Sequence, residues 1–423
     1  MLFAHSNYQR RENVAEYQIT LAETDVVQLL QRDGGFATLL TKVLNQVLEA
    51  QVTDHLGAQP HERNDERQGY RNGYRDRELT TRVGTLTLRV PRVRDGSFSP
   101  DLFTRYQRSE QAFVLALCEM VVQGVSTRKV NAIVEELCGA AISKSQVSVL
   151  CQALDPLVAD WRTRKLDAQP YPFVLVDALV VKVRIDRRVR QQAVLIATGV
   201  RADGYREILG FSVDERESTT SWDTFLRSLH DRGVSGVDLV VSDDHAGLVA
   251  AIGKNFPGAS WQRCQAHFTR NIIDACPKAH QSVLAERLRA LFNAPDLETA
   301  RDGLRKLLAD YGTTAAKAMD TLEAGFEDAM AVMPLPAPIR TRLRTTNSVE
   351  RLNEEVRRRE RVIRIFPNTA SVERLLGAVL QEHDEAWTSG KRYLDLTGYW
   401  QWRQGQEAVC AGQGPLCTAR LAA

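Results

Sequence analysis

Hydrophobic positions change their spacing several times along the chain, and each change predicts a different kind of element. In residues 1–60 apolar side chains recur every three or four positions, as at Leu40, Leu44 and Val47, which predicts a helical segment. From 61 to 108 arginine, glycine and tyrosine dominate, and alternation over Thr80–Pro91 predicts one or two short strands. Residues 69–75 predict a turn-rich loop, which either contacts phosphates and bases or is a solvated linker.

Helical spacing returns in residues 109–168, where short helices are separated by polar turns. One turn is Gly124–Thr127, and a second, Ser143–Ser145, precedes a predicted helix over 146–154. This arrangement predicts a helix-turn-helix-like DNA-binding domain, whose second helix presents Lys144 and Gln146 to a major groove. An ordinary helical hairpin without DNA contacts has the same pattern, so the spacing leaves both interpretations open.

Strand patterns begin at Pro172 and alternate with helices as far as residue 275. The predicted order is three strands, helix, strand, helix, strand and helix, with Asp203-Gly204 as a hairpin turn. Phe173–Val176 forms the first strand, and Val180–Ile185 either continues that strand or pairs with it. The order is typical of an α/β fold, a ribonuclease-H-like catalytic domain with a mixed sheet.

The remaining residues complete a predicted division of the chain into seven segments. Residues 276–340 show helical spacing without strand patterns and predict an all-α insertion between two parts of the catalytic core, 169–275 and 341–403. Residues 404–423 are small and mixed, so we expect a disordered tail. With the N-terminal segment 1–60, the basic linker 61–108 and the helical domain 109–168, the chain has a mainly helical N-terminal DNA-binding region.

Composition excludes several classes of protein but does not by itself indicate a partner. The 423 residues are 43% hydrophobic and 26% charged with a net charge of +2, which is typical of a water-soluble globular protein. No apolar run is long enough to span a bilayer, and the start has no signal-peptide pattern. The seven cysteines are odd in number and scattered, which favours free thiols in a reducing cytoplasm.

Positive charge is concentrated in residues 347–367, which predict a helix that is apolar on one face and basic on the other. Glu350 lies in its opening turn, and Ser348 is a candidate for the helix cap. A solvated helix with ordinary Glu–Arg pairs is one interpretation. The other is that Glu350 binds a metal ion while arginines bind DNA phosphates, and the candidates for DNA contact are Arg351, Asn353, Arg357, Arg358 and Arg359.

Two aspartates complete a candidate metal site with Glu350. Asp177 follows the first predicted strand and Asp243 follows the fourth, and these strands are neighbours in the predicted topology. Three converging carboxylates suit Mg²⁺ or Mn²⁺, and a pair of such ions supports in-line phosphoryl displacement. Asp244 competes with Asp243 for this role, because a slip of one residue along a strand exchanges the two faces.

Cysteine and histidine pairs give a second group of candidates. Cys264 and His267 form a C-x-x-H pair, and Cys276 and His280 follow within the next turns of helix. Together they have the ligand types of a structural zinc site. We favour the interpretation that Cys264 and His267 support the wall of the metal site or contact DNA, with structural zinc as the less favoured alternative. His245, beside Asp243, is a lesser candidate for phosphate contact.

Several of these motifs resemble those of the IS256 (Mutator-type) transposases of bacterial insertion sequences. They are 176–178 (VDA), 241–248 (VSDDHAGL), 262–267 (QRCQAH) with Arg270-Asn271, and 346–353 (TNSVERLN) through Arg358-Arg359 to Phe366-Pro367. Upstream, 82–92 and 124–128 resemble the same family. The resemblance implies a DDE transposase with Asp177, Asp243 and Glu350 as its acidic triad, and it favours Asp243 over Asp244. It also implies Cys264 and His267 as the family signature.

The resemblance further implies partners and a reaction. The N-terminal region is expected to bind double-stranded DNA at the terminal inverted repeats, and the protein is expected to attack target DNA. Movement is expected by copy-out–paste-in through a circular intermediate. The resemblance also implies a helical insertion before Glu350. We expect a homodimer or higher oligomer on DNA, in the cytoplasm at the nucleoid. A catalytically silent DNA-binding protein derived from a transposase is the alternative, and a structure-specific nuclease is a third.

Overall fold

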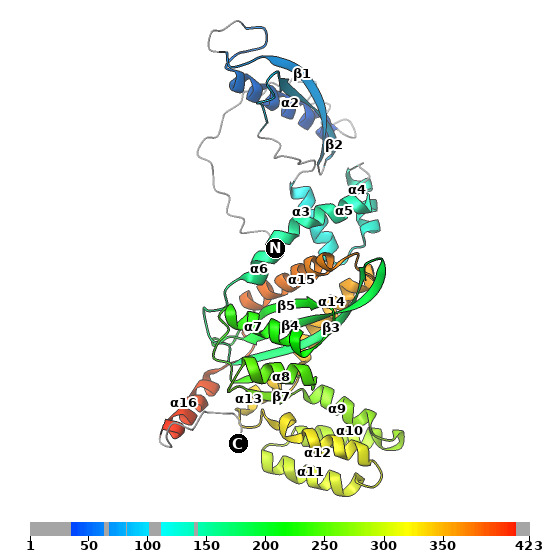
Figure 1. Cartoon of the computed structure of the whole chain (residues 1–423), viewed down its shortest axis with the longest axis vertical. Helices are drawn as coiled ribbons and strands as arrows, with labels where there is room; N and C mark the ends of the chain where they lie inside the picture. The colour runs from blue at the N-terminus through cyan, green and yellow to red at the C-terminus, as the bar shows by residue number, and fades with distance from the viewer. Residues whose placement is uncertain (1–34, 63–66, 82, 101–110, 139–142, 412–423) are drawn as a thin grey trace. The chain divides into compact units, whose positions relative to one another are not determined.

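The computed structural model describes residues 35–62, 67–81, 83–100, 111–138 and 143–411 (Figure 1). The chain forms two compact units, one ending at Leu154 and the other beginning at Asp155. The predictions for residues 1–34 and for 412–423 lie outside the described residues. Each unit is considered below by itself.

The first unit contains a helix packed on a two-stranded hairpin. Helix α2 spans Gly35–Leu56, and strands β1 (Arg71–Thr81) and β2 (Gly84–Val93) pair antiparallel. Every second residue of β2 is buried along Gly84–Val90, as expected for a strand with one face on a core. The core residues are Leu48, Leu79, Leu86, Leu88 and Val90. The predicted helix and strands are therefore confirmed.

The predicted loop over residues 69–75 is wrong from Arg71 onward, because β1 begins there. The Arg71 guanidinium anchors this end of the strand to α2 through Glu49 at 3.0 Å and the Thr53 hydroxyl at 2.7 Å. The turn-forming residues are accommodated by an irregularity in the pairing between Arg71 and Tyr74, where Gly73 has a φ of 69°.

Short helices follow in the first unit. They are α3 (Gln111–Val122), α4 (Thr127–Cys138) and α5 (Lys144–Leu150), with a 3₁₀ turn over Cys151–Leu154. A capping box starts α5, since the Ser143 hydroxyl accepts from the Gln146 amide and the Gln146 side chain accepts from the Ser143 amide. The predicted helices are present, and residues 139–142 between α4 and α5 lie outside the described residues.

The second unit is built on a five-stranded mixed sheet, and its strand order confirms that the first and fourth strands are neighbours. The order is β5-β4-β3-β6-β7, antiparallel from β5 to β3 and parallel from β3 to β7. Gly204 makes the hairpin turn between β4 and β5 with a φ of 88°. The strands are β3 (Phe173–Ile185), β4 (Arg188–Val200), β5 (Arg206–Asp214), β6 (Leu239–Ser242) and β7 (Ser260–Arg263).

Helices cover both faces of this sheet (Figure 1). On one face, α7 (Thr219–Asp231) and α8 (Ala246–Asn255) bury Trp222, Leu226 and Leu248 against alternate residues of β3, including Val174 and Val176. On the other face lie α14 (Asn347–Ile363) and α15 (Thr369–Ser389). Residues of β3 with odd numbers, among them Asp177, point to this second face because side chains alternate along a strand.

A helical cluster adjoins the β7 edge of the sheet. It consists of α9 (Gln265–Asp274), α10 (Gln281–Phe292), α11 (Leu297–Tyr311) and α12 (Ala316–Met330). A 3₁₀ turn at Lys278–His280 comes directly before α10, and α13 (Ala337–Leu343) follows the cluster. The four helices share one hydrophobic core with Phe268, Leu288 and Phe326 at its centre. The buried Gln262 side chain ties the cluster to β7 through Ala329 O and Val332 N, each at 2.7 Å.

The described chain ends in helix α16, Thr397–Ala411. The predicted disordered tail from residue 404 is therefore wrong for 404–411. Tyr399 fixes the start of this helix, because its buried ring lies edge-on to Phe173 of β3 and its hydroxyl donates to Asp238. The small residues of the tail thus continue a helix that is anchored at its first turn.

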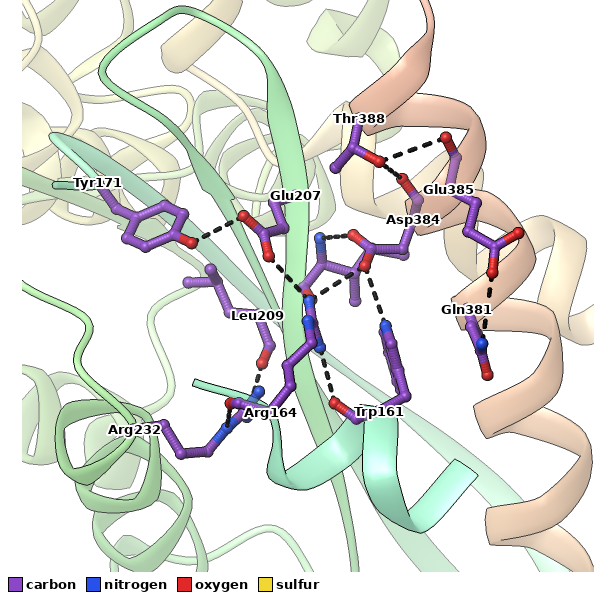
Figure 2. Close-up of polar contacts among 11 residues, drawn as sticks. Trp161, Arg164, Tyr171, Glu207, Leu209, Arg232, Gln381, Asp384, Glu385 and Thr388 are labelled. Carbon is purple, nitrogen blue, oxygen red and sulfur yellow. Dashed lines mark hydrogen bonds and ion pairs between the residues drawn. The ribbon is translucent and has the colours of Figure 1, made fainter. Parts of the chain in front are cut away.

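Helix α6 (Asp155–Thr163) is held on α15 and β5 by a buried polar network (Figure 2). Asp384 of α15 accepts from Trp161 Nε1 at 3.0 Å, from Arg164 at 3.1 Å and from the Ile208 amide at 2.6 Å. Arg164 also pairs with Glu207 at 3.1 Å. The network joins the sheet edge at β5 to the helices on its second face.

Candidate active site

Asp177 lies in the middle of a long strand, at the point where its parallel neighbour ends. Of the two alternatives for Val180–Ile185, continuation of the first strand is confirmed, and the resulting strand β3 does not end at Asp177. The parallel pairing of β3 with β6 covers only Phe173–Leu175, and the last pair is Leu175 with Val241. Asp177 and Asp243 are each two residues beyond that pair, so the register places them at one level of the sheet.

The same register separates Asp243 from Asp244. Asp243 follows Val241 by two positions, and its charge raises the pKa of Asp177, so it lies close to that carboxyl. Asp244 instead forms an ion pair with Arg263 at 3.0 Å. Of the two aspartates, Asp243 is therefore the one aligned with Asp177.

Helix α14 brings Glu350 to Asp177 and is fixed at both ends. Thr346 precedes the helix, and both its amide and its hydroxyl lie 3.3 Å from the buried Cys264 thiol. At the other end Phe366 pairs with β3, where its amide donates to Lys182 O at 2.8 Å. The prediction that Ser348 caps the helix is wrong, since α14 already includes Asn347 and the residue before it is Thr346.

Asn353, which the sequence predicts as a DNA contact, instead contacts Asp177 directly. Its Nδ2 donates to Asp177 Oδ2 at 2.8 Å, and the residue is buried. Asn353 is three positions after Glu350, so both side chains lie on the same face of α14. That spacing was the available indication that Asn353 faces the acidic site.

His267 and Cys264 form the wall of the site on the side of α9. His267 Nε2 lies 3.4 Å from Glu350 Oε1. The Cys264 amide donates to Ser242 O at 2.7 Å, immediately before Asp243. The C-x-x-H pair therefore connects the end of β6 with the start of α14, and the structure brings its residues together with Glu350.

The charges at this site act on one another. Burial raises the pKa of Asp177 to about 7, and the carboxylates of Asp243 and Glu350 add to the rise. The hydrogen bond from the Ala178 amide and the charge of His267 act in the opposite direction and lower this pKa. The Cys264 thiol beside it raises the pKa of His267 to about 9 despite burial, so His267 is charged at neutral pH. Three carboxylates and one imidazolium thus share one electrostatic neighbourhood.

The donor atoms at this site suit a hard divalent cation. Glu350 Oε1 and Asn353 Oδ1 are buried and have no hydrogen-bond partner, and a buried oxygen without a partner is costly unless something else binds it. Carboxylate and amide oxygens are the ligands of Mg²⁺ and Mn²⁺. Within the described part of the chain, no three His, Cys, Asp or Glu side chains are already gathered closely enough to hold a metal ion.

The arginines of α14 divide into an exposed and a buried group. Arg351, Arg357 and Arg358 are exposed, whereas Arg359 is only 4% exposed and pairs with Glu355. The prediction that Arg359 contacts DNA therefore conflicts with its burial, because it lies on the apolar side of the helix. Three of the four predicted arginines remain accessible to a phosphate.

Other candidate residues have local contacts. The Gln146 side-chain oxygen accepts from the Ser143 amide at 2.8 Å, and Lys144 is the first residue of α5. Cys276 contacts Pro277 O, and the His280 ring lies edge-on to Tyr311. His245 Nδ1 lies 3.6 Å from Glu217. Among the described residues, these contacts do not place Cys276 or His280 beside Cys264.

Comparison with known proteins shows the family. Residues 12–390 match the family model described as "Transposase, Mutator family". The chain is 45% identical over 389 residues, 90% of its length and 100% of the relative's, to the transposase for insertion sequence element IS256 in transposon Tn4001 of Staphylococcus aureus. It is 46% identical over 368 residues, 87% of its length and 92% of the relative's, to the ISRM5 transposase of Rhizobium meliloti.

A third relative is the transposase for insertion sequence element IS1081 of Mycobacterium tuberculosis, with 43% identity over 362 residues, 85% of this chain and 86% of the relative. The chain therefore belongs to the Mutator family of transposases, and the resemblance noted in the sequence is confirmed. None of the helices that the structure describes is long and apolar enough to cross a membrane.

Proposed function

We propose that the chain is a DDE transposase that binds the terminal inverted repeats of its insertion sequence and catalyses metal-dependent cleavage and transfer of DNA strands. The observation that carries the proposal is the docking of α14 on the buried Asp177, where Asn353, one turn after Glu350, donates to Asp177 Oδ2 at 2.8 Å. Asp243 and Glu350 are both close enough to raise the pKa of Asp177. The mixed sheet order supports a ribonuclease-H-like core, and helices α10–α12 lie within residues 276–340, the predicted all-α insertion.

Asp177, Asp243 and Glu350 would hold the metal, Mg²⁺ or Mn²⁺, as a pair of ions. When bound, such ions activate an attacking water or 3′-hydroxyl and stabilise the leaving oxygen. Asn353 orients Asp177, since its amide already donates to Oδ2. The charged His267 offsets part of the negative charge of Glu350 and holds its carboxylate near the sheet.

DNA would be bound by both units. The exposed side chains of Arg351, Arg357 and Arg358 can pair with backbone phosphates beside the acidic site. In the first unit, helix α5 with Lys144 and Gln146 is the candidate reader of the terminal repeats. We further propose that the protein acts as a homodimer or higher oligomer on DNA, at the nucleoid.

A strand-cleavage assay on a duplex carrying the terminal repeat tests this proposal. Asp177→Asn, Asp243→Asn and Glu350→Gln should each lower Mg²⁺-dependent cleavage by about a thousandfold or more, because residues that act as a unit fail together. Asp244→Asn is the matched control. The amide oxygen of asparagine can still accept from the buried Arg263 guanidinium, so cleavage should stay within about twofold of the unchanged protein.

The pattern of results separates the candidate triad from its alternatives. Unchanged cleavage by any one of the three variants would remove that residue from the site. A loss with Asp244→Asn and not with Asp243→Asn would exchange the two aspartates. Repeat-specific binding by the unchanged protein, with no nicking in Mg²⁺ or Mn²⁺, would contradict the proposal and favour a silent DNA-binding protein.

A further inference from the structure

A second group of arginines lies close to the start of α14 and forms no ion pair with an acidic residue in the described part of the chain. The Arg206 guanidinium, at the first position of β5, lies 4.0 Å from the ring centre of Trp387 and 4.3 Å from that of Tyr393. Arg342 of α13 lies 5.8 Å from the same Tyr393 ring. We call Arg206, Arg342 and Arg351, together with these two rings, the Arg206 cluster.

The chain fold holds the cluster firmly. After α15 the backbone turns back, and the amides of Tyr393 and Leu394 both donate to Gly204 O, at 2.9 and 3.0 Å. Gly204 allows this close approach, since a Cβ there would lie 2.0 Å from Leu394 O. The β4–β5 turn therefore fixes the Tyr393 ring over Arg206.

The charges of the cluster are not neutralised by the protein. Among the described residues, no Asp or Glu forms an ion pair with Arg206, Arg342 or Arg351, although other arginines of this unit have such partners. Burial lowers the pKa of Arg206, and the like charges of Arg342 and Arg351 lower it further. Cation–π contacts of about 0.5–2 kcal/mol orient the guanidinium but do not supply a counter-charge.

We propose that the Arg206 cluster binds the phosphodiester backbone of the DNA strand beside the scissile phosphate. Arg351 lies in the same turn of α14 as Glu350, and Arg342 lies on α13, which directly precedes α14, so the cluster and the acidic site share one stretch of chain. A planar guanidinium held against two rings offers its N–H groups to phosphate oxygens in a fixed direction. This inference rests on the proposed function and adds Arg206 and Arg342 to the residues that contact substrate.

Methylphosphonate substitution, which removes the charge of single phosphates, tests the proposal on the full chain. Binding of terminal-repeat duplexes is measured in Ca²⁺ by fluorescence anisotropy, with and without neutral linkages at the nucleotides flanking the cleavage point. The unchanged protein should lose affinity on neutralisation. Arg342→Gln and Arg206→Gln should bind the charged duplex about 5- to 20-fold more weakly and lose their response to neutralisation, with a salt slope lower by about one.

Arg301→Gln is the matched control, because Arg301 is paired with Glu327 on the helical cluster at 3.0 Å and should keep both responses. Arg342 is exposed, so its variant tests the cluster even if Arg206→Gln unfolds. Arginine variants that still respond to neutralisation like the unchanged protein would overturn the inference while cleavage continues to support the proposed function. Failure of the unchanged protein to bind or cleave the duplex would overturn both.

Discussion

Asp177 and Asp384 are both buried aspartates on the second face of the same sheet, yet their surroundings differ. Asp384 has three donors, from Trp161, Arg164 and the Ile208 amide (Figure 2). Asp177 has the Asn353 amide and the adjacent Ala178 amide. Glu350 beside it has His267 Nε2 at 3.4 Å from Oε1, an oxygen that accepts no hydrogen bond.

Burial raises the pKa of both aspartates, so solvation alone does not separate them. What separates them is the balance of the neighbouring charges. At Asp384 one arginine, Arg164, opposes the rise in pKa and one carboxylate, Glu207, adds to it. At Asp177 two carboxylates, Asp243 and Glu350, add to the rise and His267 opposes it. A carboxylate whose partners are supplied by the protein stabilises the fold. A group of carboxylates left without sufficient partners is suited to a cation.

The largest effect on folding should come from Asp384→Ala. Removing this carboxylate leaves Trp161 Nε1 and the Ile208 amide unpaired and takes one of two acidic partners from Arg164, at a cost of about 3–5 kcal/mol in the free energy of unfolding. Urea unfolding measures the change. Asp384→Asn keeps an acceptor oxygen and should cost less, and an Ala variant as stable as the unchanged protein would remove the structural role.

A smaller effect, on catalysis, is expected from Asn353→Ala. Mutation of a residue that holds a metal ligand in place typically lowers metal affinity or activity by about 10–100-fold. Cleavage by Asn353→Ala should therefore fall by about that factor. Asn293→Ala is the control, since the Asn293 amide oxygen pairs with Arg344 and not with a carboxylate. Cleavage rates at saturating DNA measure the difference. A fall of the same size in the control would show that the loss is not specific to the Asp177 contact.

A third effect is a pH dependence of stability in the metal-free protein. The pKa of Asp177 rises from 3.8 to about 7 on folding, so the folded state favours the protonated group. The stability that this preference contributes is present at pH 4 and is lost as the pH rises towards 7 and above. Asp177→Asn should therefore be close to the unchanged protein in stability at pH 4 and more stable at pH 8.

Urea unfolding in EDTA at the two pH values measures this gap. A gap that stays constant between pH 4 and pH 8 would mean that Asp177 is not in a setting that raises its pKa.

The sequence predicted the sheet and the helices well because their patterns are local. The apolar strands and the Asp203-Gly204 turn are visible in short windows, and the adjacency of the first and fourth strands followed from the predicted topology. The length of β3 and the start of α14 were not predictable in this way. Both depend on contacts with distant residues, namely Phe366 on β3 and Thr346 with Cys264.

The roles of individual residues on α14 show the same limit. Asn353 and Arg359 both look like DNA contacts in a basic helix, but the packing of α14 turns them inward, one towards Asp177 and the other towards Glu355. Helical periodicity assigns such residues to a face only when the buried face is known. The cluster around Arg206 was also invisible, since it assembles four separate segments of the second unit.

The most direct test of the account is Mn²⁺ binding to the full chain without DNA, measured by titration calorimetry. The unchanged protein and Asp244→Asn should bind Mn²⁺ alike, whereas Asp177→Asn and Glu350→Gln should bind at least about tenfold more weakly, because each removes a carboxylate ligand. Equal binding of Mn²⁺ by all four proteins would contradict the claim that these carboxylates form a metal site.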